Sequence, residues 1–515
     1  MTEYVHKHHD LGEFRGLRRG DDVVQFRGIP YADIPGRFFQ AQLRTKLPQT
    51  PFDATRPGPI CPQNDAMPFP PLWQKSPDLL GPALTPPVAD EFHCLNLNVT
   101  APLSVLEGGE PCPVMGFIHG GAFMTGSASV QVGGREIYDA TNLVHASITL
   151  KQPIIVVAIN YRLGPLGFLA SKQLKELNES RNEPIGNYGL HDQAHAIEWV
   201  SRFIAGFGGD PSSITLQGAS AGGASCHFQA VSFSKSRVKR AILASGTALA
   251  IGAMPLDYHQ DRYDALCRKF GEEQDDYVNV LQSVPVQVLV NEVSSVSKPL
   301  IDEQYITGRG MPWLKDVPTN VDLLIGSCEY EDDVTLAILG HFAPSPPTAV
   351  TLGNHVEAAL IPSGVTSMTS KYFSPEMLNV IFRVPPYLIA GYDDTAAGKV
   401  YVYEFQAKSP YPNWPPGYDR SHHAVTDVFL FDVASDLVPE QHRNRWSTAV
   451  SELRSAWIKF CWGELPWEAA TTDGGEAKLA YVLKDNKTWQ SRPIMGDFIN
   501  DKIAARWEAL LRVAD

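Results

Sequence analysis

Cysteine is scarce in this sequence: only seven of the 515 residues are cysteines. A disulfide framework is therefore excluded as the main source of stability, and the odd number leaves at least one thiol unpaired. Charged residues are also few, at 19% against 44% hydrophobic residues, and the sequence contains no internal repeat. This balance excludes a globally disordered chain and supplies enough apolar side chains for a large core.

Positive charge is in deficit as well. Lysine and arginine together number 43 against 57 aspartates and glutamates, which gives a formal net charge of −14. A protein with this excess of negative charge is not suited to neutralising phosphate groups. We therefore expect neither a nucleic-acid partner nor binding to an anionic membrane.

Long hydrophobic runs are missing too. Residues 1–16 contain no apolar stretch of the kind that forms the centre of a signal peptide. The apolar, uncharged run of residues 241–256 is shorter than the roughly 18 residues that a membrane-spanning helix needs. We expect no membrane insertion and an intracellular location, with secretion left open as the alternative. The sequence does not indicate an oligomeric state.

Apolar, β-branched runs alternate with segments of helical periodicity along the chain. This alternation predicts an α/β protein with a mostly parallel central sheet flanked by helices. The expected strands are 113–118, 153–160, 213–218, 239–245, 321–326 and 399–405, and the expected helices are 188–207 and 445–462. We interpret residues 1–515 as one catalytic domain that carries loop or cap insertions near 62–93, 255–320 and 335–395.

Ser220 lies at the centre of a G-x-S-x-G pattern formed by residues 218–222. An expected strand precedes it, and a helix of small residues follows. A strand–turn–helix of this kind places a serine on a tight turn, where the N-terminus of the helix can stabilise an oxyanion. We therefore predict that Ser220 is a nucleophile.

A glycine-rich loop, residues 119–123, follows directly after the expected strand 113–118. Acyl transfer needs two or more backbone N–H donors aimed at the oxygen of the tetrahedral intermediate. A loop that begins His119-Gly120-Gly121 can supply such donors because few side chains obstruct its backbone. We expect His119 to shape this loop rather than to transfer protons.

Four further segments carry a family resemblance. The sequence reads FRGIPYA at 26–32, NYRLGPLGF at 160–168, GNYGLHDQ at 186–193 and FGGDP at 207–211. These segments resemble the type-B carboxylesterase/lipase family, which includes the cholinesterases. The resemblance implies an α/β-hydrolase fold whose insertions form an active-site gorge, with no cofactor. It also implies hydrolysis of carboxylic esters through an acyl-enzyme intermediate.

The resemblance also assigns roles around the nucleophile. Gly121, Ala122 and Ala221 would donate their N–H groups to the oxyanion. Ala122 stands where many family members have a third glycine, a change that leaves the backbone donor in place. Ser225 would support the catalytic acid.

The acid and the base would follow in the order that this fold uses, serine, then acid, then histidine. The family places the acid five residues after the glycine that ends a strand, which is Glu331 after Gly326 in this sequence. Asp332 replaces the glycine that usually follows the acid. Asp332 and Glu329 are therefore the alternatives to Glu331.

The base would be His423, because its spacing to Phe431 fits the family pattern H-G-x-[DE]-x-x-[FY]-[VL]-F. The chain departs from that pattern at Ala424 and Thr426. His422 is the alternative, since a shift of one residue in the loop would present it instead.

Two pairs of residues could form further sites. Cys61 and Cys94 fall where the family closes a loop with a disulfide, a bond that a reducing cytosol would disfavour. His191 and His195 have a spacing that can bind a metal on a helix, but the glutamate of an H-E-x-x-H motif is absent. We expect no metal site.

The predicted substrate is a small, neutral and fairly apolar ester or lactone. The second half of segment 62–93 lacks the tryptophan that stacks on choline in cholinesterases, so a quaternary-ammonium substrate is disfavoured. A lipase or sterol-ester hydrolase, or a hydrolase or cyclase of secondary metabolism, are the alternatives among enzymes. A catalytically silent binding module is disfavoured because all three candidate catalytic residues are present.

Overall fold

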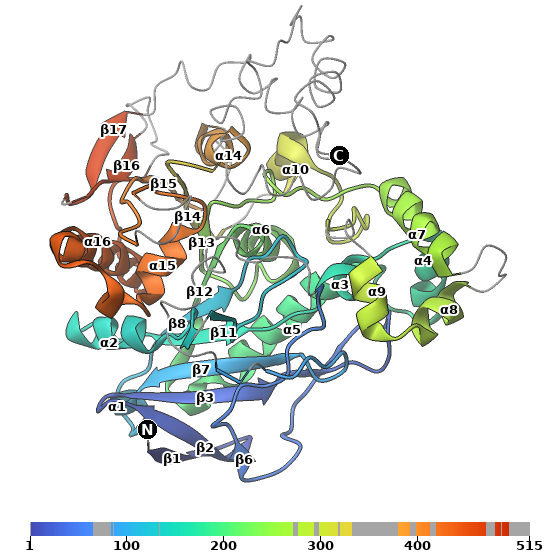
Figure 1. Cartoon of the computed structure of the whole chain (residues 1–515), viewed down its shortest axis with the longest axis horizontal. Coiled ribbons are helices and arrows are strands. Elements are labelled where there is room, and N and C mark those ends of the chain that lie inside the picture. The colour runs from blue at the N-terminus through green and yellow to red at the C-terminus, as the bar shows by residue number, and fades with distance from the viewer. Residues whose placement is uncertain are drawn as a thin grey trace, which may run out of the picture.

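One large mixed β-sheet forms the centre of the computed structural model (Figure 1). The structure describes residues 2–64, 84–85, 87–132, 134–270, 277–292, 298–317, 320–331, 380–391, 398–411, 419–469, 479–485 and 487–493. Across the sheet, the strands are β1 (Glu3–His8), β2 (Gly12–Arg19), β3 (Val23–Pro30), β7 (Asn96–Pro102), β11 (Ile155–Ile159), β8 (Cys112–Ile118), β12 (Gly209–Ala219), β13 (Arg240–Ala244), β14 (Asp322–Cys328), β15 (Val400–Phe405), β16 (Leu479–Leu483) and β17 (Gln490–Pro493).

The middle of this sheet is parallel and its margins are antiparallel. From β11 through β16 every neighbouring pair in this order runs in parallel. The pairs β1–β2, β2–β3, β3–β7, β7–β11 and β16–β17 are antiparallel. The remaining short strands are β6 (Phe52–Asp53), which pairs with β2, and the two pairs β4 (Ala32–Asp33) with β5 (Gln42–Leu43) and β9 (Gln131–Val132) with β10 (Arg135–Glu136). All six strands expected from the sequence are present, so the prediction of an α/β-hydrolase fold is confirmed.

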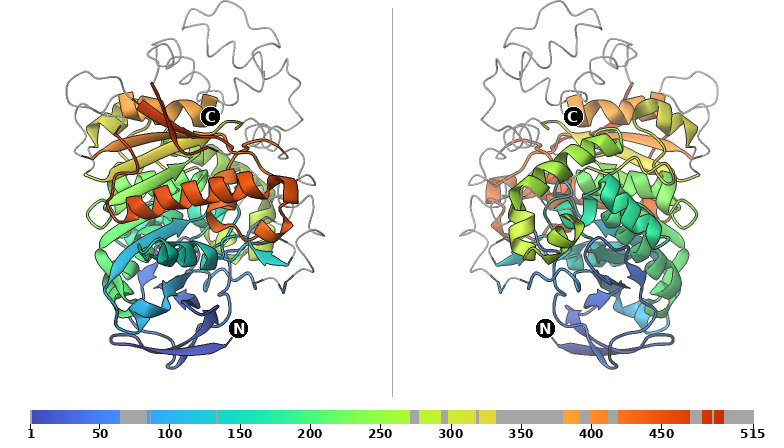
Figure 2. Two further views of the ribbon diagram at one scale, coloured as in Figure 1. Left: turned by 90° about the vertical axis from the view of Figure 1, so that its left-hand side faces the viewer. Right: turned by 90° about the vertical axis from the view of Figure 1, so that its right-hand side faces the viewer.

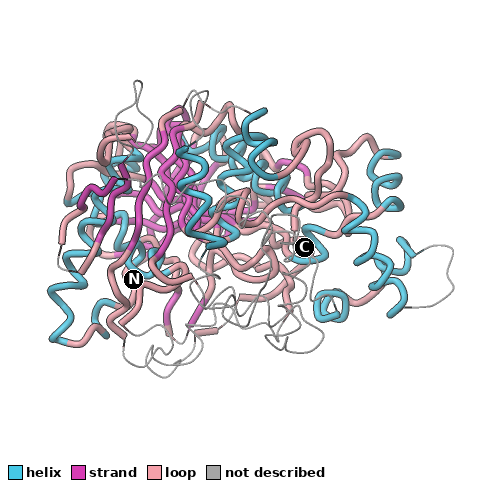
Figure 3. The backbone as a smooth tube through the Cα atoms, turned by 90° about the horizontal axis from the view of Figure 1, so that it is seen from above, coloured by secondary structure: helices cyan, strands magenta, loops and turns pink. Residues whose placement is uncertain are grey.

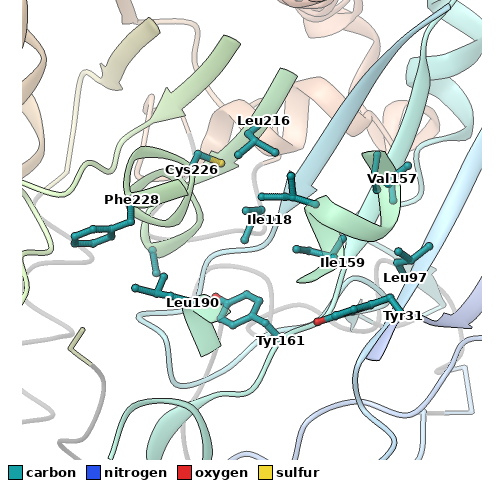
Figure 4. Packing of buried hydrophobic residues seen from close by; sticks show 14 of the residues in the cluster. Tyr31, Leu97, Ile118, Val157, Ile159, Tyr161, Leu190, Leu216, Cys226 and Phe228 are labelled. Atoms are coloured by element: carbon teal, nitrogen blue, oxygen red, sulfur yellow. The ribbon is translucent and has the colours of Figure 1, made fainter. Parts of the chain in front are cut away.

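The continuous apolar character of the central strands follows from burial on both faces of the sheet. In β8, Val114 and Ile118 belong to one hydrophobic cluster, and Met115 and Phe117 belong to another on the opposite face. The period of two that alternates these side chains is the ordinary geometry of a strand. Figure 4 shows the first cluster, in which Ile118 lies near Leu216 of β12.

Helices cover both faces of the sheet (Figures 2 and 3). The second cluster packs under α2, α15 and α16, and α16 is the long orange helix in the left-hand view of Figure 2. The first cluster packs under α5 and α6. The helices are α1 (Leu103–Leu106), α2 (Thr141–Thr149), α3 (Gly164–Phe168), α4 (Lys172–Ser180), α5 (Tyr188–Phe203), α6 (Ala221–Phe228), α7 (Leu256–Phe270), α8 (Tyr277–Ser283), α9 (Val286–Glu292), α10 (Gly310–Asp316), α14 (Val380–Gly391), α15 (Val425–Phe431) and α16 (Arg443–Cys461).

The two helices expected from periodicity are present as α5 and α16. A short 3₁₀ turn, Ile204–Phe207, completes the segment that was expected to be helical up to residue 207. Among the described residues, none of the helices combines the length and the hydropathy required to cross a bilayer.

Two of the three expected insertions lie largely outside the described residues. Residues 65–83 and 332–379 are not described, so the predicted gorge around them stays a prediction. The insertion near 255–320 forms α7 to α10, and α7, α8 and α9 lie together at the right of Figure 1. From the third insertion, the structure describes α14, which packs against β14 and β15.

Candidate active site

The candidate residues lie in loops that leave the carboxyl ends of parallel strands. Loop 119–123 follows β8, Ser220 follows β12, and Glu331 follows β14. His423 lies between β15 and α15. In an open α/β sheet the carboxyl ends of the parallel strands meet at one edge, which is where such proteins bind ligands. The topology therefore brings residues separated by about 300 positions in the sequence to one edge of the sheet.

Ser220 occupies the turn between β12 and α6. Its backbone has φ 58° and ψ −126°, a conformation that a residue with a side chain adopts at a cost of about 1–3 kcal/mol. The turn is held on both sides, because the Ser220 N–H donates to Ala244 O at 2.9 Å and Ala224 N donates to Ser220 O at 3.0 Å. Such strain concentrates at functional sites, where the surrounding structure maintains it.

Two glycines make this turn possible. A Cβ atom on Gly222 would overlap the carbonyl oxygen of Ile118, and one on Gly246 would overlap the carbonyl oxygen of Ser220. Both obstacles are backbone atoms, which cannot move aside as a flexible side chain can. The two glycines of the G-x-S-x-G pattern, Gly218 and Gly222, thus reflect the close packing of the serine turn against the end of β8.

The glycine-rich loop lies against the serine turn. A Cβ atom on Gly120 would stand 2.7 Å from Ala219 O and 3.3 Å from the Cβ atom of Ser220. Gly121 and Ala122 have positive φ angles of 117° and 54°. Ala122 therefore adopts a conformation that favours glycine, the residue that many members of the resembled family have at this position.

His119 and Tyr161 hold this loop in place through hydrogen bonds and ring stacking. The Nδ1 atom of His119 bonds Gly120 O at 2.8 Å, the Tyr161 hydroxyl donates to His119 O at 3.0 Å, and the two rings stack with centroids 4.5 Å apart. Complete burial lowers the pKa of His119 to about 4, so the ring is neutral at pH 7. These contacts support the expectation that His119 shapes the loop.

Glu331 and His423 form a buried carboxylate–imidazole pair. Glu331 is fully buried and His423 is 6% exposed. Glu331 Oε2 contacts Nδ1 of His423, and Glu331 Oε1 accepts a hydrogen bond from the N–H of Cys328 at 2.8 Å. A carboxylate bonded to Nδ1 fixes the orientation of the imidazole and stabilises its protonated form.

Two of the three alternatives, His422 and Glu329, have other hydrogen-bond partners. His422 bonds the carbonyl of its neighbour His423 through Nδ1 at 3.0 Å, and burial lowers its pKa to about 4. Glu329 is half-buried, its N–H donates to Phe405 O, and burial raises the pKa of its carboxyl. Asp332 lies outside the described residues. The contact of Glu331 with His423 thus favours these two residues over their alternatives.

The end of β15 ties the acid loop to the base loop. Phe405 O accepts hydrogen bonds from Glu329 N at 2.9 Å and from the hydroxyl of Ser421 at 2.5 Å. Ser421 O in turn accepts from Tyr330 N at 2.9 Å. The ring of Phe382 in α14 also contacts the base, because its centroid lies 4.7 Å from that of the His423 ring. Acid and base are therefore held by one continuous frame.

Ser245 is a neighbour of the acid that the sequence reasoning missed. Its hydroxyl accepts a hydrogen bond from Cys328 N at 3.3 Å, and the same N–H also donates to Glu331. In the sheet, Ala219 pairs with Ala244 and Ala244 with Gly326, so Ser245 lies between the serine turn and the acid loop. The available signal was a serine directly after the strand that lies between β12 and β14.

Ser225 has a different neighbourhood. Its hydroxyl accepts a hydrogen bond from Gln193 of α5 at 3.0 Å. Its predicted support of the acid stays a prediction.

The structure does not contain the possible disulfide between Cys61 and Cys94. Cys61 and Cys94 are both buried and are free thiols. They lie in contact, since a hydrogen bond with Cys61 and burial raise the pKa of the Cys94 thiol. The Sγ atom of Cys61 also accepts a hydrogen bond from Leu163 N at 3.3 Å.

Of the two histidines considered as a metal site, His191 packs among aromatic side chains. His191 meets the rings of Phe233 and Tyr305 edge to face, and burial lowers its pKa to about 3. Within the described ranges, His8, His9 and Asp10 bring potential ligand atoms within 4.8 Å of one another. Both ring nitrogens of His8 are already engaged there, by Phe203 O and by the N–H groups of Asp10 and Leu11.

The known proteins to which this chain is similar are ester hydrolases by name. The model of the carboxylesterase family matches residues 5–351. Lipase 3 of Yarrowia lipolytica is 28% identical over 468 residues, which cover 87% of this chain and 86% of that protein. Para-nitrobenzyl esterase of Bacillus subtilis is 28% identical over 481 residues, covering 87% of this chain and 88% of the relative. Secreted triacylglycerol lipase LIP1 of Gibberella zeae is 29% identical over 363 residues, 65% of this chain and 58% of that protein.

Proposed function

The chain belongs to the carboxylesterase family, and we propose that Ser220, His423 and Glu331 carry out its hydrolysis of carboxylic esters. The observation that carries this assignment is the buried contact between Glu331 and Nδ1 of His423. It provides an oriented base at the sheet edge where the strained turn presents Ser220. A serine at its ordinary pKa is a weak nucleophile and requires such a base.

The first half of the reaction acylates the enzyme. Ser220 Oγ attacks the ester carbonyl carbon while His423 Nε2 takes the hydroxyl proton. The carbonyl oxygen becomes an oxyanion, and the N–H groups of Gly121, Ala122 and Ala221 donate hydrogen bonds to it. His423 then gives its proton to the alcohol oxygen as the C–O bond breaks. The alcohol leaves and the acyl group stays on Ser220.

The second half repeats these steps with water. His423 Nε2 removes a proton from a water molecule, whose oxygen attacks the acyl carbon. The tetrahedral intermediate collapses by breaking its bond to Ser220 Oγ, which recovers the proton from His423. In both halves Glu331 stabilises the transient imidazolium and keeps Nε2 directed at the reacting atoms. The products are a carboxylic acid and the regenerated enzyme.

The substrate is proposed to be a neutral, fairly apolar ester or lactone. The relatives named above include both lipases and an esterase, so a lipase is the alternative. A panel of p-nitrophenyl esters of graded acyl length, with lactones and amides beside it, separates the two. An esterase should hydrolyse dissolved short esters at full rate, whereas a lipase should accelerate when the ester forms an interface. A folded preparation that hydrolyses no member of the panel would contradict the proposal.

Glu331→Gln should lower kcat by about 10²–10⁴-fold, because a neutral amide no longer stabilises the imidazolium or selects its tautomer. Glu329→Gln and Asp332→Asn are the matched controls, since each also neutralises one carboxylate of the same loop. Both controls should retain kcat within about tenfold of the unmodified protein. If Asp332→Asn causes the severe loss and Glu331→Gln does not, the acid has been misassigned.

We propose that residues 1–515 form one catalytic domain. The sheet supports this because β1 near the N-terminus and β17 near residue 493 belong to it together. Strands from such distant parts of the chain complete one structure rather than two separable ones.

The cellular location has two alternatives. The sequence favours an intracellular protein, whereas one relative is named as a secreted lipase. Assaying ester hydrolysis in the cells and in the medium of an expressing culture would separate the alternatives.

A further inference from the structure

A second buried carboxyl group lies beside the proposed base. Asp427 occupies the first turn of α15, four residues after His423, and is 3% exposed. It is not part of the proposed triad, because Glu331 is the carboxylate that contacts Nδ1 of His423. A carboxyl group buried to this degree is costly to ionise unless something compensates its charge.

Gln217 connects Asp427 to the strand of the nucleophile. Gln217 lies in β12, three residues before Ser220, and is fully buried. Its Nε2 atom donates a hydrogen bond to Asp427 Oδ1 at 3.3 Å. Within the described part of the chain, Oε1 of Gln217 has no hydrogen-bond partner. The amide can therefore serve both forms of the carboxyl group: Nε2 donates to the carboxylate, and a flipped amide accepts from the acid.

Four titratable groups from different elements interact electrostatically with Asp427. They are His423 in the loop before α15, Cys226 of α6, Tyr403 of β15 and Tyr138 after β10. Burial and the charge of Asp427 raise the pKa of Tyr138, Cys226 and Tyr403, so these three groups are neutral at pH 7. Of these four groups, His423 is the one that can carry a positive charge.

Burial raises the pKa of Asp427 to about 7, while the hydrogen bond from Gln217 and the charge of His423 act in the opposite direction. Unlike an exposed aspartate, Asp427 therefore changes its charge close to neutral pH. The change occurs in the pH range where a histidine base also titrates.

We propose that Asp427 is a positioning residue that acts through His423: its carboxylate supports the imidazolium formed during each half-reaction, and its protonation withdraws that support. The inference rests on the proposed function, because it requires His423 to be the base. It adds a second ionisation to the pH dependence of the enzyme, located on the helix that begins just after the base.

The sign of the effect follows from the two charges. As pH rises, His423 loses the proton that prevents it from accepting one from Ser220, and Asp427 gains the negative charge that favours the imidazolium in the transition state. Both changes increase activity. The acid limb of kcat/KM should therefore contain two coupled ionisations rather than one, and their apparent values belong to the pair.

The test compares the pH profiles of kcat/KM for a p-nitrophenyl ester in the unmodified protein and in Asp427→Asn. This substitution preserves volume and removes the charge. The profile of Asp427→Asn should reduce to one ionisation, displaced to lower pH, and its plateau should fall about tenfold because a nearby negative charge is lost. Gln217→Met, which removes the donor to the carboxylate, should move the second ionisation upward by about one pH unit.

An infrared titration supplies a readout that does not depend on activity. A buried protonated carboxyl group should give a C=O band that disappears as pH rises through neutrality in the unmodified protein, and this band should be missing in Asp427→Asn. Absence of the band in the unmodified protein would overturn the proposal. If Asp427→Asn does not fold, Gln217→Met replaces it in the infrared titration. The proposal then requires Gln217→Met to shift the pH at which the carboxyl band disappears.

Failure of this inference is distinguishable from failure of the proposed function. If the unmodified protein hydrolyses esters, Ser220→Ala does not, and Asp427→Asn keeps the original profile and plateau, the role of Asp427 is wrong and the triad stands. If Ser220→Ala retains full activity, the triad is wrong, and the role of Asp427 is overturned with it.

Discussion

Ser220→Ala is expected to lower kcat for ester hydrolysis by about 10³–10⁶-fold, the range found when a serine nucleophile is removed from a catalytic triad. The reason is chemical rather than structural. Alanine lacks the oxygen that forms the acyl bond, but it has the same Cβ atom and meets the same constraint at φ 58°. The fold and the oxyanion loop should therefore be retained, and the remaining rate should come from binding and from the N–H donors alone.

The matched control is Ser234→Ala. Ser234 is also buried, and its hydroxyl donates to Gln229 Oε1 at 2.8 Å in the segment that follows α6. This variant loses one ordinary hydrogen bond, so its stability should fall by about 1 kcal/mol while kcat stays within about threefold of the unmodified value. Urea unfolding of both variants, measured beside the kinetics, separates an unfolded preparation from an inactive one. Equal activity of the two variants would remove Ser220 from the mechanism.

His423→Ala is expected to reduce kcat by about 10⁴–10⁶-fold, and His422→Ala by less than about tenfold. The two histidines are adjacent and both buried. Glu331 contacts the ring of His423, whereas the ring of His422 bonds the carbonyl of His423. An imidazole that is not oriented by a carboxylate makes a poor base. Activity at saturating ester, with folding checked by circular dichroism, measures the difference.

The outcomes of this pair separate the remaining possibilities. Loss of turnover confined to His422→Ala would show that the loop presents the other histidine. Loss in both variants would require the pH profile of His422→Ala, which should keep the unmodified shape if His422 only holds the loop. Retained activity in both would remove the triad mechanism. In the unmodified protein activity should rise with pH, because only the neutral imidazole accepts a proton from Ser220.

The central strands could be predicted because a strand that is buried on both faces appears in the sequence as a continuous apolar run. Every residue of β8 and β11 is buried, and each strand appeared as a continuous apolar run in the sequence. The N-terminal strands left no such trace. In β1 and β2, charged residues such as Lys7 and Arg15 alternate with buried ones, since these strands lie at the margin of the sheet with one side exposed. The helices α7 to α10 were likewise recognised only as an insertion.

The candidate site divides in a similar way. Ser220 and the glycine-rich loop could be predicted because close packing of backbones demands a local pattern of small residues. Ser245 and Gln217 could not, because their importance depends on which strands become neighbours in the sheet. The spacing to Phe431 predicted His423 rather than His422, but whether the ring of His423 contacts the acid depends on the three-dimensional path of the loop. One residue of shift decides which ring contacts Glu331, and the sequence around the pair departs from the family pattern at Ala424 and Thr426.

The most direct test of the account is covalent labelling with a fluorophosphonate, followed by peptide mapping. The activated serine attacks the phosphorus atom as it would an ester carbonyl: an O–P bond forms, the P–F bond breaks and fluoride leaves. One label per chain is expected, on the peptide that contains Ser220, with loss of ester hydrolysis in step with labelling. His423→Ala should label far more slowly, since the base that activates the serine is gone. A label on a different serine, or no label on a preparation that hydrolyses esters, would contradict the assignment of Ser220 as the nucleophile.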